Sequence, residues 1–170
     1  MNGKGVCRDI EKLEPVLRER VRKLLSVFKE KGIPVGISET LRYDNVQKCY
    51  YMQGRCTLEK VNEARKEAGL YLLSESENKN TVTNCDGVNH RSNHQERNGT
   101  GFGYAIDLVP LNEKGNFWWN APENIWREMG AIAEECGVDW CAGGRGEHWG
   151  WDSPHYELLK DWSEGSNPIT

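Results

Sequence analysis

The sequence lacks both an excess of positive charge and a long apolar run. Its 170 residues include 22 Lys and Arg against 26 Asp and Glu, so the formal net charge is −4. A nucleic-acid-binding domain usually carries a basic patch, and an anionic membrane surface also attracts basic proteins. The aliphatic stretch from Val21 to Phe28 is interrupted by Arg22 and Lys23. We therefore expect neither nucleic acid nor a membrane among the partners.

The first residues do not form the apolar segment of a secretion signal. Such a segment needs about 7–15 uncharged apolar residues. This part of the chain instead alternates charges at Arg8, Asp9, Glu11 and Lys12. We expect the protein to be made in the cytoplasm without a signal peptide.

The cysteines do not follow a metal-binding or scaffold pattern. The six Cys stand at positions 7, 49, 56, 85, 136 and 141, with no Cys-x-x-Cys pair and no alternation with His at zinc-finger spacing. Disulfides are rare in the cytoplasm, so we expect reduced structural thiols. The pairs Cys49–Cys56 and Cys136–Cys141 remain alternatives for a protein that is exported.

The hydrophobic pattern predicts one domain of the α+β class, a small antiparallel sheet with flanking helices. Leu17, Val21, Leu24 and Phe28 recur at steps of three and four residues, which is typical of an amphipathic helix. By similar reasoning, helices are expected over 13–28, 40–54 after an opening loop, 57–70 and 122–136. Short apolar runs predict strands over 33–37, 81–83, 104–110, 138–140 and 149–159. The domain is expected to span residues 1–170, with a loose N-terminus over about 1–8.

The most informative residue is Asp107, which lies inside the apolar run from Tyr104 to Pro110. An ionised carboxylate that is buried in such a run costs several kcal/mol unless it is paired or bound to a cation. A salt bridge or a turn-capping role would also satisfy this carboxylate. A metal ion is therefore one of two interpretations of Asp107.

Two further segments contain histidine beside other ligand-type residues. Asp152 and His155 lie three residues apart, and Pro154 excludes a regular helix between them but allows a bend that brings both side chains together. Glu157 shares a strand face with His155, from which it could orient a ligand. His94 lies upstream in a Gly- and Asn-rich segment. A packed or solvated histidine is the alternative for each, but two His, one Asp and a spare Asp are also the composition of a catalytic zinc site.

Three short motifs follow one another along the chain: Ser92-x-His94, then Gly103-x-Ala105-x-Asp107, then Asp152-x-x-His155. In this order they resemble the zinc peptidases that cleave peptidoglycan stem peptides, a family of D-alanyl-D-alanine carboxypeptidases and of L-alanyl-D-glutamate endopeptidases from bacteria and phage endolysins. Further residues look like the endopeptidase branch: Glu39-Thr40-x-Arg42, Gln47, Tyr51-Met52-Gln53-Gly54-Arg55 and Val82-Thr83. The resemblance covers residues 13–159, which is nearly the whole chain.

This resemblance implies roles for five residues. His94, Asp107 and His155 would hold one zinc ion (Zn²⁺) per chain. Asp152 would be the general base, which takes a proton from water and later delivers it to the leaving amine. Arg42 would hold a substrate carboxylate or the developing oxyanion, with a surface arginine as the alternative.

One feature departs from the family pattern. Twelve residues, 95–106, separate His94 from Asp107, more than the family usually has. A surface loop insertion costs little free energy, so the assignment is kept. His90 is the competing ligand, but only His94 has Ser92 two positions before it. His148, close to the second motif, either lines the cleft or has a structural role.

The resemblance implies a single catalytic domain that acts as a monomer on the peptidoglycan stem peptide, with the L-alanyl–D-glutamate bond as the expected site of hydrolysis. A phage-type enzyme would accumulate in the cytoplasm and act on the cell wall after release through a holin lesion. The alternatives are a D-Ala-D-Ala carboxypeptidase with the same zinc site and a catalytically silent wall-binding domain. Asp152 counts against the silent domain, because a structural zinc site needs no base and usually closes its fourth position.

Overall fold

The structure is a computed structural model that describes residues 1–144 and 150–160. Its α-helices are α1 (Pro15–Glu30), α2 (Asp44–Met52), α3 (Leu58–Ala68) and α4 (Glu123–Glu135). Its strands are β1 (Val35–Glu39), β2 (Ala105–Pro110), β3 (Val138–Trp140) and β4 (His155–Leu158). Two short 3-10 helices, η1 (Ile10–Lys12) and η2 (Glu77–Lys79), complete the described elements. This composition confirms the predicted α+β class.

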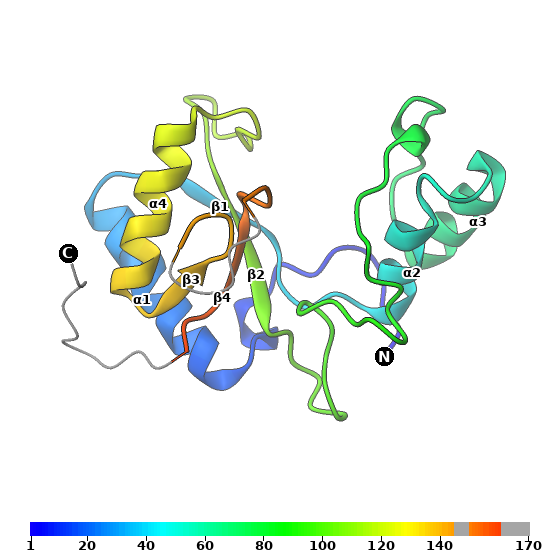
Figure 1. Cartoon of the computed structure of the whole chain (residues 1–170). Coiled ribbons are helices and arrows are strands. Elements are labelled where there is room, and N and C mark those ends of the chain that lie inside the picture. Colours follow the sequence, from blue (N-terminus) through cyan, green and yellow to red (C-terminus); the bar gives the residue numbers. More distant parts are fainter. Residues whose placement is uncertain (145–149, 161–170) are drawn as a thin grey trace.

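The strands form one antiparallel sheet in the order β1-β2-β4-β3 (Figure 1). In the central pair, Asp107 of β2 lies opposite His155 of β4. On the other side of β2, Glu39 of β1 lies opposite Asp107, after a register irregularity in β1. The register therefore brings three ionisable residues from distant parts of the sequence into one row across the sheet.

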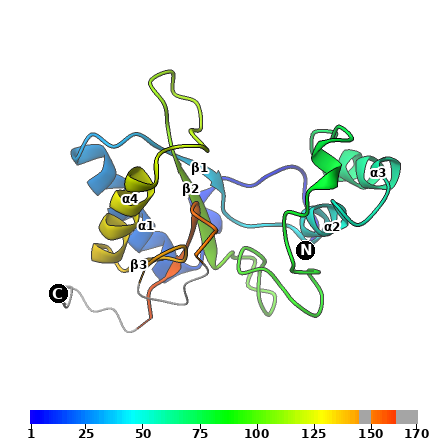
Figure 2. The same cartoon turned by 45° about the horizontal axis from the view of Figure 1, so that its top comes forward.

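The two faces of this sheet differ in polarity, because side chains alternate along each strand. Ile106 and Leu108 of β2 lie on the same face as Tyr156 of β4, and all three are fully buried. Helices α1 and α4 cover this face, as both Figure 1 and Figure 2 show. Asp107 and His155 lie on the other face, on the side of α2 and α3. The core residues of α1 and α4 are Leu17, Val21, Leu24, Phe28, Trp126, Met129, Ile132 and Ala133.

Helix α1 forms as its sequence pattern predicts. Its buried residues follow one another at intervals of three and four, which is one face of a helix. Pro15 occupies the first turn, where its missing N–H is not needed, and the Glu14 carboxylate caps the helix by accepting the Leu17 N–H at 2.9 Å. Leu13, which was predicted to be helical, instead precedes the helix and bridges to Gly103.

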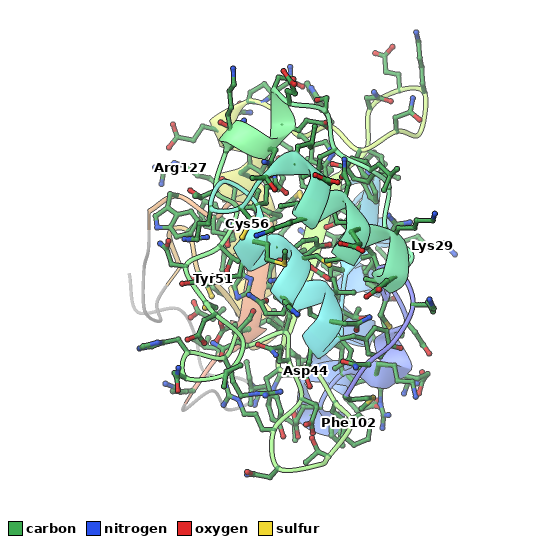
Figure 3. All side chains as sticks on the ribbon, turned by 90° about the vertical axis from the view of Figure 1, so that its right-hand side faces the viewer. Lys29, Asp44, Tyr51, Cys56, Phe102 and Arg127 are labelled. Atoms are coloured by element: carbon green, nitrogen blue, oxygen red, sulfur yellow. The ribbon has the colours of Figure 1, made fainter. Side chains whose placement is uncertain are left out.

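Helices α2 and α3 pack together, and with the segment that follows them we call residues 44–84 the helical arm (Figures 1 and 2). Figure 3 faces this arm, with Asp44 at the start of α2 and Tyr51 near its end. Helix α3 ends at Gly69, whose φ of 72° lies in the left-handed region that glycine adopts without strain. The segment after α3 is fixed by Asn62, which donates to the Leu73 carbonyl at 2.9 Å and accepts the Leu73 N–H at 2.8 Å.

Three predicted strands differ from the observed ones. The strand predicted over 33–37 is shifted by two residues, since β1 spans Val35–Glu39. Residues 81–83 are not a strand, because they find no strand partner among the described residues, and Val82 is exposed. The strand predicted over 149–159 is shorter, since β4 begins at His155 and the His155 N–H donates to the Asp152 carbonyl in a turn, at 3.1 Å. Pro154 has no N–H for a strand ladder, which explains why pairing starts after it. Residue 149 lies outside the described residues.

Among the residues that the structure describes, no helix combines the length and the apolar character needed to cross a lipid bilayer. All six cysteines lie in the described ranges and are free thiols. The structure therefore contains neither of the two disulfides that the sequence left open.

Candidate metal centre

Three side chains converge on the polar face of the sheet. His94 Nε2 lies 3.1 Å from Asp107 Oδ1 and 3.1 Å from His155 Nδ1. His155 Nδ1 lies 3.3 Å from Asp107 Oδ1. The three predicted ligands thus place one atom each at the corners of a nearly equilateral triangle.

The sheet itself positions two of these ligands. Asp107 and His155 are cross-strand partners of β2 and β4. Directly opposed residues have Cβ atoms about 4.5–5.5 Å apart, so a carboxylate and an imidazole meet there without a special loop. The strand alternation buries Ile106 and Tyr156 on one face of the sheet. It therefore also turns Asp107 and His155 toward the opposite, polar face.

The third ligand, His94, comes from a loop whose backbone is held in place. Ser92 Oγ accepts the His94 N–H at 3.3 Å, and the His94 carbonyl accepts the Arg42 N–H at 2.9 Å. The His94 ring bonds through Nδ1 to the Thr40 carbonyl at 2.7 Å. His94 is only 1% exposed, so its imidazole has little freedom to leave this position.

Hydrogen bonds set the proton positions on both imidazoles. The Thr40 carbonyl can only accept, so His94 Nδ1 carries a proton and donates it. On His155, Nε2 lies 2.8 Å from Oε1 of Glu157, which as a carboxylate also accepts. In a neutral imidazole the other nitrogen then holds a lone pair. When both rings are neutral, His94 Nε2 and His155 Nδ1 therefore point lone pairs at one another and at the Asp107 carboxylate.

This arrangement calls for a cation between the three atoms. Two lone pairs and a carboxylate oxygen at 3.1–3.3 Å repel one another unless a positive charge lies among them. Neighbouring ligand atoms of a tetrahedral Zn²⁺ with bonds of about 2.0–2.1 Å lie about 3.3–3.4 Å apart, which the triangle closely matches. Two histidine nitrogens and one carboxylate oxygen are also a usual donor set of catalytic zinc. The residues fit a zinc ion.

The same contacts shift the pKa values of the ligands. Burial acts to raise the pKa of Asp107, but the imidazoles of His94 and His155 hold it well below its usual range. Burial acts to lower the pKa of His155, but its contacts with Asp107 and Glu157 raise it to about 9. A proton and a metal ion therefore compete for Nδ1 of His155, as they do at any histidine ligand.

A chain of hydrogen bonds supports His155 from behind. Asn93 Nδ2 donates to Glu157 Oε1 at 2.6 Å, the oxygen that also accepts from His155. Arg97 in turn donates to Asn93 Oδ1. These hydrogen bonds therefore connect the long loop 95–104 to a metal ligand. Such contacts orient a ligand and raise its basicity.

The ligand triangle lines a cavity of about 500 Å³. Asp152 lines the same cavity because the turn before β4 folds it back beside His155. Burial raises the pKa of Asp152. Trp151 is 68% exposed at this site, and Arg91 also lines it. A cavity of this size can hold part of a peptide.

Arg42 lines the cavity too, but it is not the surface arginine of the alternative interpretation. Its side chain is 12% exposed, and Nε donates to Glu39 Oε2 at 2.9 Å while a terminal nitrogen donates to Gln47 Oε1 at 3.0 Å. Burial acts to lower the pKa of Arg42, but the charge of Glu39 raises it above its usual value. A permanently charged guanidinium is thus fixed beside the metal ligands.

The remaining candidates of the sequence fall outside this group. His90 is exposed, and its backbone N–H donates to Asp86, so His90 does not join the ligands. His148 lies outside the described residues. The sequence did not single out Asn93 or the Thr40 carbonyl. Both lie in or beside the quoted motifs, but only the folded chain brings them to the ligands.

A second set of ligand-type atoms adjoins the first. Cys141 Sγ, a ring nitrogen of His155 and a carboxylate oxygen of Glu157 lie within 4.8 Å of one another. Burial, together with nearby carboxylates, raises the pKa of the Cys141 thiol, which keeps it protonated. We therefore assign the metal to His94, Asp107 and His155.

No protein-family model matches this sequence, and no curated protein sequence matches it either. The chain is similar to the L-Ala D-Glu endopeptidase ChiX of Serratia marcescens, with 17% identity, a TM-score of 0.45 and coverage of 92% of this chain and 90% of that one. It is also similar to the LD-carboxypeptidase LdcB, with 12% identity, a TM-score of 0.46 and coverage of 93% and 65%. A third similar structure is a VanY D,D-pentapeptidase in complex with Zn(II), with 10% identity, a TM-score of 0.49 and coverage of 94% and 79%.

Proposed function

We propose that this protein is a zinc metallopeptidase that hydrolyses a peptide bond of the peptidoglycan stem, namely the L-alanyl–D-glutamate bond. The observation that carries the proposal is the triangle of His94, Asp107 and His155 in a cavity that also contains Asp152 and Arg42. A structural zinc site usually has four protein ligands, whereas a catalytic one has three and an open position. Among the described residues three ligands converge on the cavity, which favours the catalytic type.

A bound Zn²⁺ would polarise the scissile carbonyl and lower the pKa of an attacking water molecule toward neutrality. Asp152 takes the proton of the attacking water and later delivers it to the leaving amine. Thr40 and Glu157 keep the outer protons of the two imidazoles in place, so the inner nitrogens remain ligands. Arg42, fixed by Glu39, attracts the developing oxyanion or a carboxylate of the substrate.

The choice of bond rests on the resemblance of residues 51–55 to the endopeptidase branch. We also propose that the protein is made in the cytoplasm and acts on the cell wall after release. Mass spectrometry of digested peptidoglycan tests the substrate and the bond together. New peptides with N-terminal D-glutamate support the endopeptidase, and free D-alanine would instead indicate the carboxypeptidase. Binding to peptidoglycan without any product would indicate a silent module.

Two variants test the roles of the residues. Asp152→Asn is expected to keep about one zinc per chain and to lose turnover, because the amide cannot accept the proton. His155→Ala is expected to lose both zinc and turnover. Glu135→Gln, an exposed carboxylate on α4, serves as the control and is expected to keep both. Normal hydrolysis by Asp152→Asn, or full activity of a metal-free protein, would contradict these assignments.

A further inference from the structure

A second cavity of about 280 Å³ adjoins the metal cavity on the side of the helical arm. Arg42 and Val82 line both cavities, so the two meet at these residues. The second cavity is walled by α2, α3 and the segment that follows them. Its other lining residues are Val6, Tyr50, Gln53, Arg65, Leu70 and Tyr71.

Arg65 of α3 is the unusual member of this wall. The residue is only 2% exposed, and its Nε donates to the Tyr71 carbonyl at 2.7 Å. Its guanidinium carbon lies 4.6 Å from the centroid of the Tyr71 ring. Within residues 1–144 and 150–160, no hydrogen-bond acceptor or ion-pair partner is found for the two terminal nitrogens of Arg65. Arg65 lines the second cavity.

The comparison with Arg42 shows what Arg65 is missing. Arg42 donates hydrogen bonds to Glu39 and Gln47. The Glu77 carboxylate accepts its hydrogen bonds from Ser74, which lower the pKa of Glu77. The charge of Arg65 also helps to lower this pKa, but no hydrogen bond joins the side chains of Arg65 and Glu77. An arginine stays charged at any physiological pH, and a buried charge without a partner is costly. The second cavity therefore presents a largely buried guanidinium whose terminal nitrogens have no anionic partner in the part of the chain that the structure describes.

We propose that Arg65 binds a free carboxylate of the peptide substrate in this second cavity, and that the protein therefore prefers stem peptides with a free carboxylate to amidated ones. This inference rests on the proposed function. The planar guanidinium offers two parallel donors, which match the two oxygens of a carboxylate. Arg42 also lines this cavity but is neutralised by Glu39, so the remaining charge of Arg65 suits a group of one negative charge better than a doubly charged phosphate.

The position of the cavity suits a peptide that extends from the metal ligands. A chain whose scissile bond lies at His155 can pass Arg42 and Val82, where the cavities meet, and place the carboxylate of its C-terminal D-alanine, two residues beyond D-glutamate, at Arg65. Two exposed residues that line this cavity are aromatic or apolar: Tyr71 is 67% exposed and Val82 51%. Such a rim can contact the uncharged part of a peptide.

The experiment compares two synthetic tetrapeptides, L-Ala–D-Glu–L-Lys–D-Ala with D-glutamate linked through its γ-carboxyl group, in which the C-terminal carboxyl group of D-alanine is either free or converted to an amide. The wild-type protein is expected to cleave the free acid with a kcat/KM about 10- to 100-fold higher. Arg65→Gln should reduce this preference to within about threefold. Lys66→Gln removes the same charge from an exposed position of the same helix and should keep the preference. Equal cleavage by the wild type, or an undiminished preference in Arg65→Gln, would overturn the inference.

Folding of each variant is checked by thermal unfolding and by zinc content. If Arg65→Gln fails to fold, Arg65→Lys replaces it as the test of the carboxylate site. This variant keeps the positive charge but loses the paired donors, so it should weaken the preference for the free acid. A preference unchanged from that of the wild type would overturn the inference. If the wild type cleaves neither peptide, the proposed function is wrong for this substrate, and calorimetric titration with the same two peptides takes over. Tighter binding of the free acid that Arg65→Gln abolishes supports the carboxylate site on its own, whereas equal binding of both peptides overturns it.

Discussion

The sheet region, made of the four strands with α1 and α4, has a core cluster of seventeen buried hydrophobic residues, whereas the cluster of the helical arm has three, Val46, Cys49 and Ala68. In the arm, hydrogen bonds from side chains to the backbone supplement this small cluster. Gln53 donates to the Glu77 carbonyl at 3.0 Å, and Arg65 donates to the Tyr71 carbonyl at 2.7 Å. Two metal ligands lie on the sheet, and the proposed carboxylate site lies on the arm.

This difference separates two requirements of a hydrolytic site. Metal ligands must keep their geometry, which a large core under β2 and β4 provides. A substrate site tolerates more movement, and local opening is easiest where few apolar contacts are buried. We therefore expect the arm to open locally at a lower free energy than the sheet region.

The largest effect is expected from Met129→Ala in the sheet core. Met129 is fully buried in α4, so its truncation removes apolar contacts and leaves a cavity. The free energy of unfolding should fall by about 2–5 kcal/mol. Urea denaturation measures this loss, and hydrogen exchange should show β2 and β4 losing protection together. A loss of protection confined to the arm would contradict the division into two regions.

The support of His155 is the next feature to test. Asn93→Leu removes the amide that donates to Glu157, so the carboxylate is free to turn away from the imidazole. Zinc affinity should fall by about 10- to 100-fold, as for other residues that orient metal ligands. Competition with a chromophoric chelator measures the affinity. Asn120→Leu, at an exposed position, is the control, and an equal loss in both variants would remove Asn93 from this role.

A smaller and more local effect is expected from Val46→Ala in the arm. The loss of two methyl groups should cost about 1.5–2.5 kcal/mol. Because the cluster around Val46 is small, faster hydrogen exchange should appear in α2 and α3 while the sheet keeps its protection. Zinc affinity is expected to stay within about threefold of the wild type. A drop in zinc affinity as large as that of Asn93→Leu would show that the arm also holds the ligands.

The elements that the sequence predicts well are those with a strong local pattern. The apolar spacing of α1 and the compact run around Asp107 each specify an element and its buried face. Asp107 is also the clearest site residue, because a carboxylate in an apolar run needs a partner whatever the fold. The strand predicted over 81–83 is wrong for a different reason. Three residues form a strand only where a neighbouring strand pairs with them, and a short apolar run does not specify that neighbour.

What the sequence could not specify is long-range pairing. Asn93 meets Glu157 only because the strands bring 157 beside the loop of His94. In the sequence, Arg65 is one of several charged residues of a helix and is expected to face solvent. In the structure, the segment after α3 folds back and covers it. Neither contact leaves a periodic trace in the sequence.

The smallest effect comes from one substitution made in both regions. Gly32 follows α1 with a φ of 71°, and Gly69 follows α3 with a φ of 72°, so alanine at either position is strained by about 1 kcal/mol. A Cβ at Gly32 would meet nothing within 4 Å, whereas one at Gly69 would lie 3.3 Å from the Gly5 nitrogen.

Gly32→Ala should lower the global free energy of unfolding measured in urea, because α1 belongs to the large core. Gly69→Ala should instead raise hydrogen exchange in α3 and lower the affinity for the free-acid peptide through Arg65, with zinc affinity unchanged. If both variants gave the same global loss and the same exchange pattern, the arm and the sheet would unfold as one unit, and the separation of metal centre and substrate site by stability would be wrong.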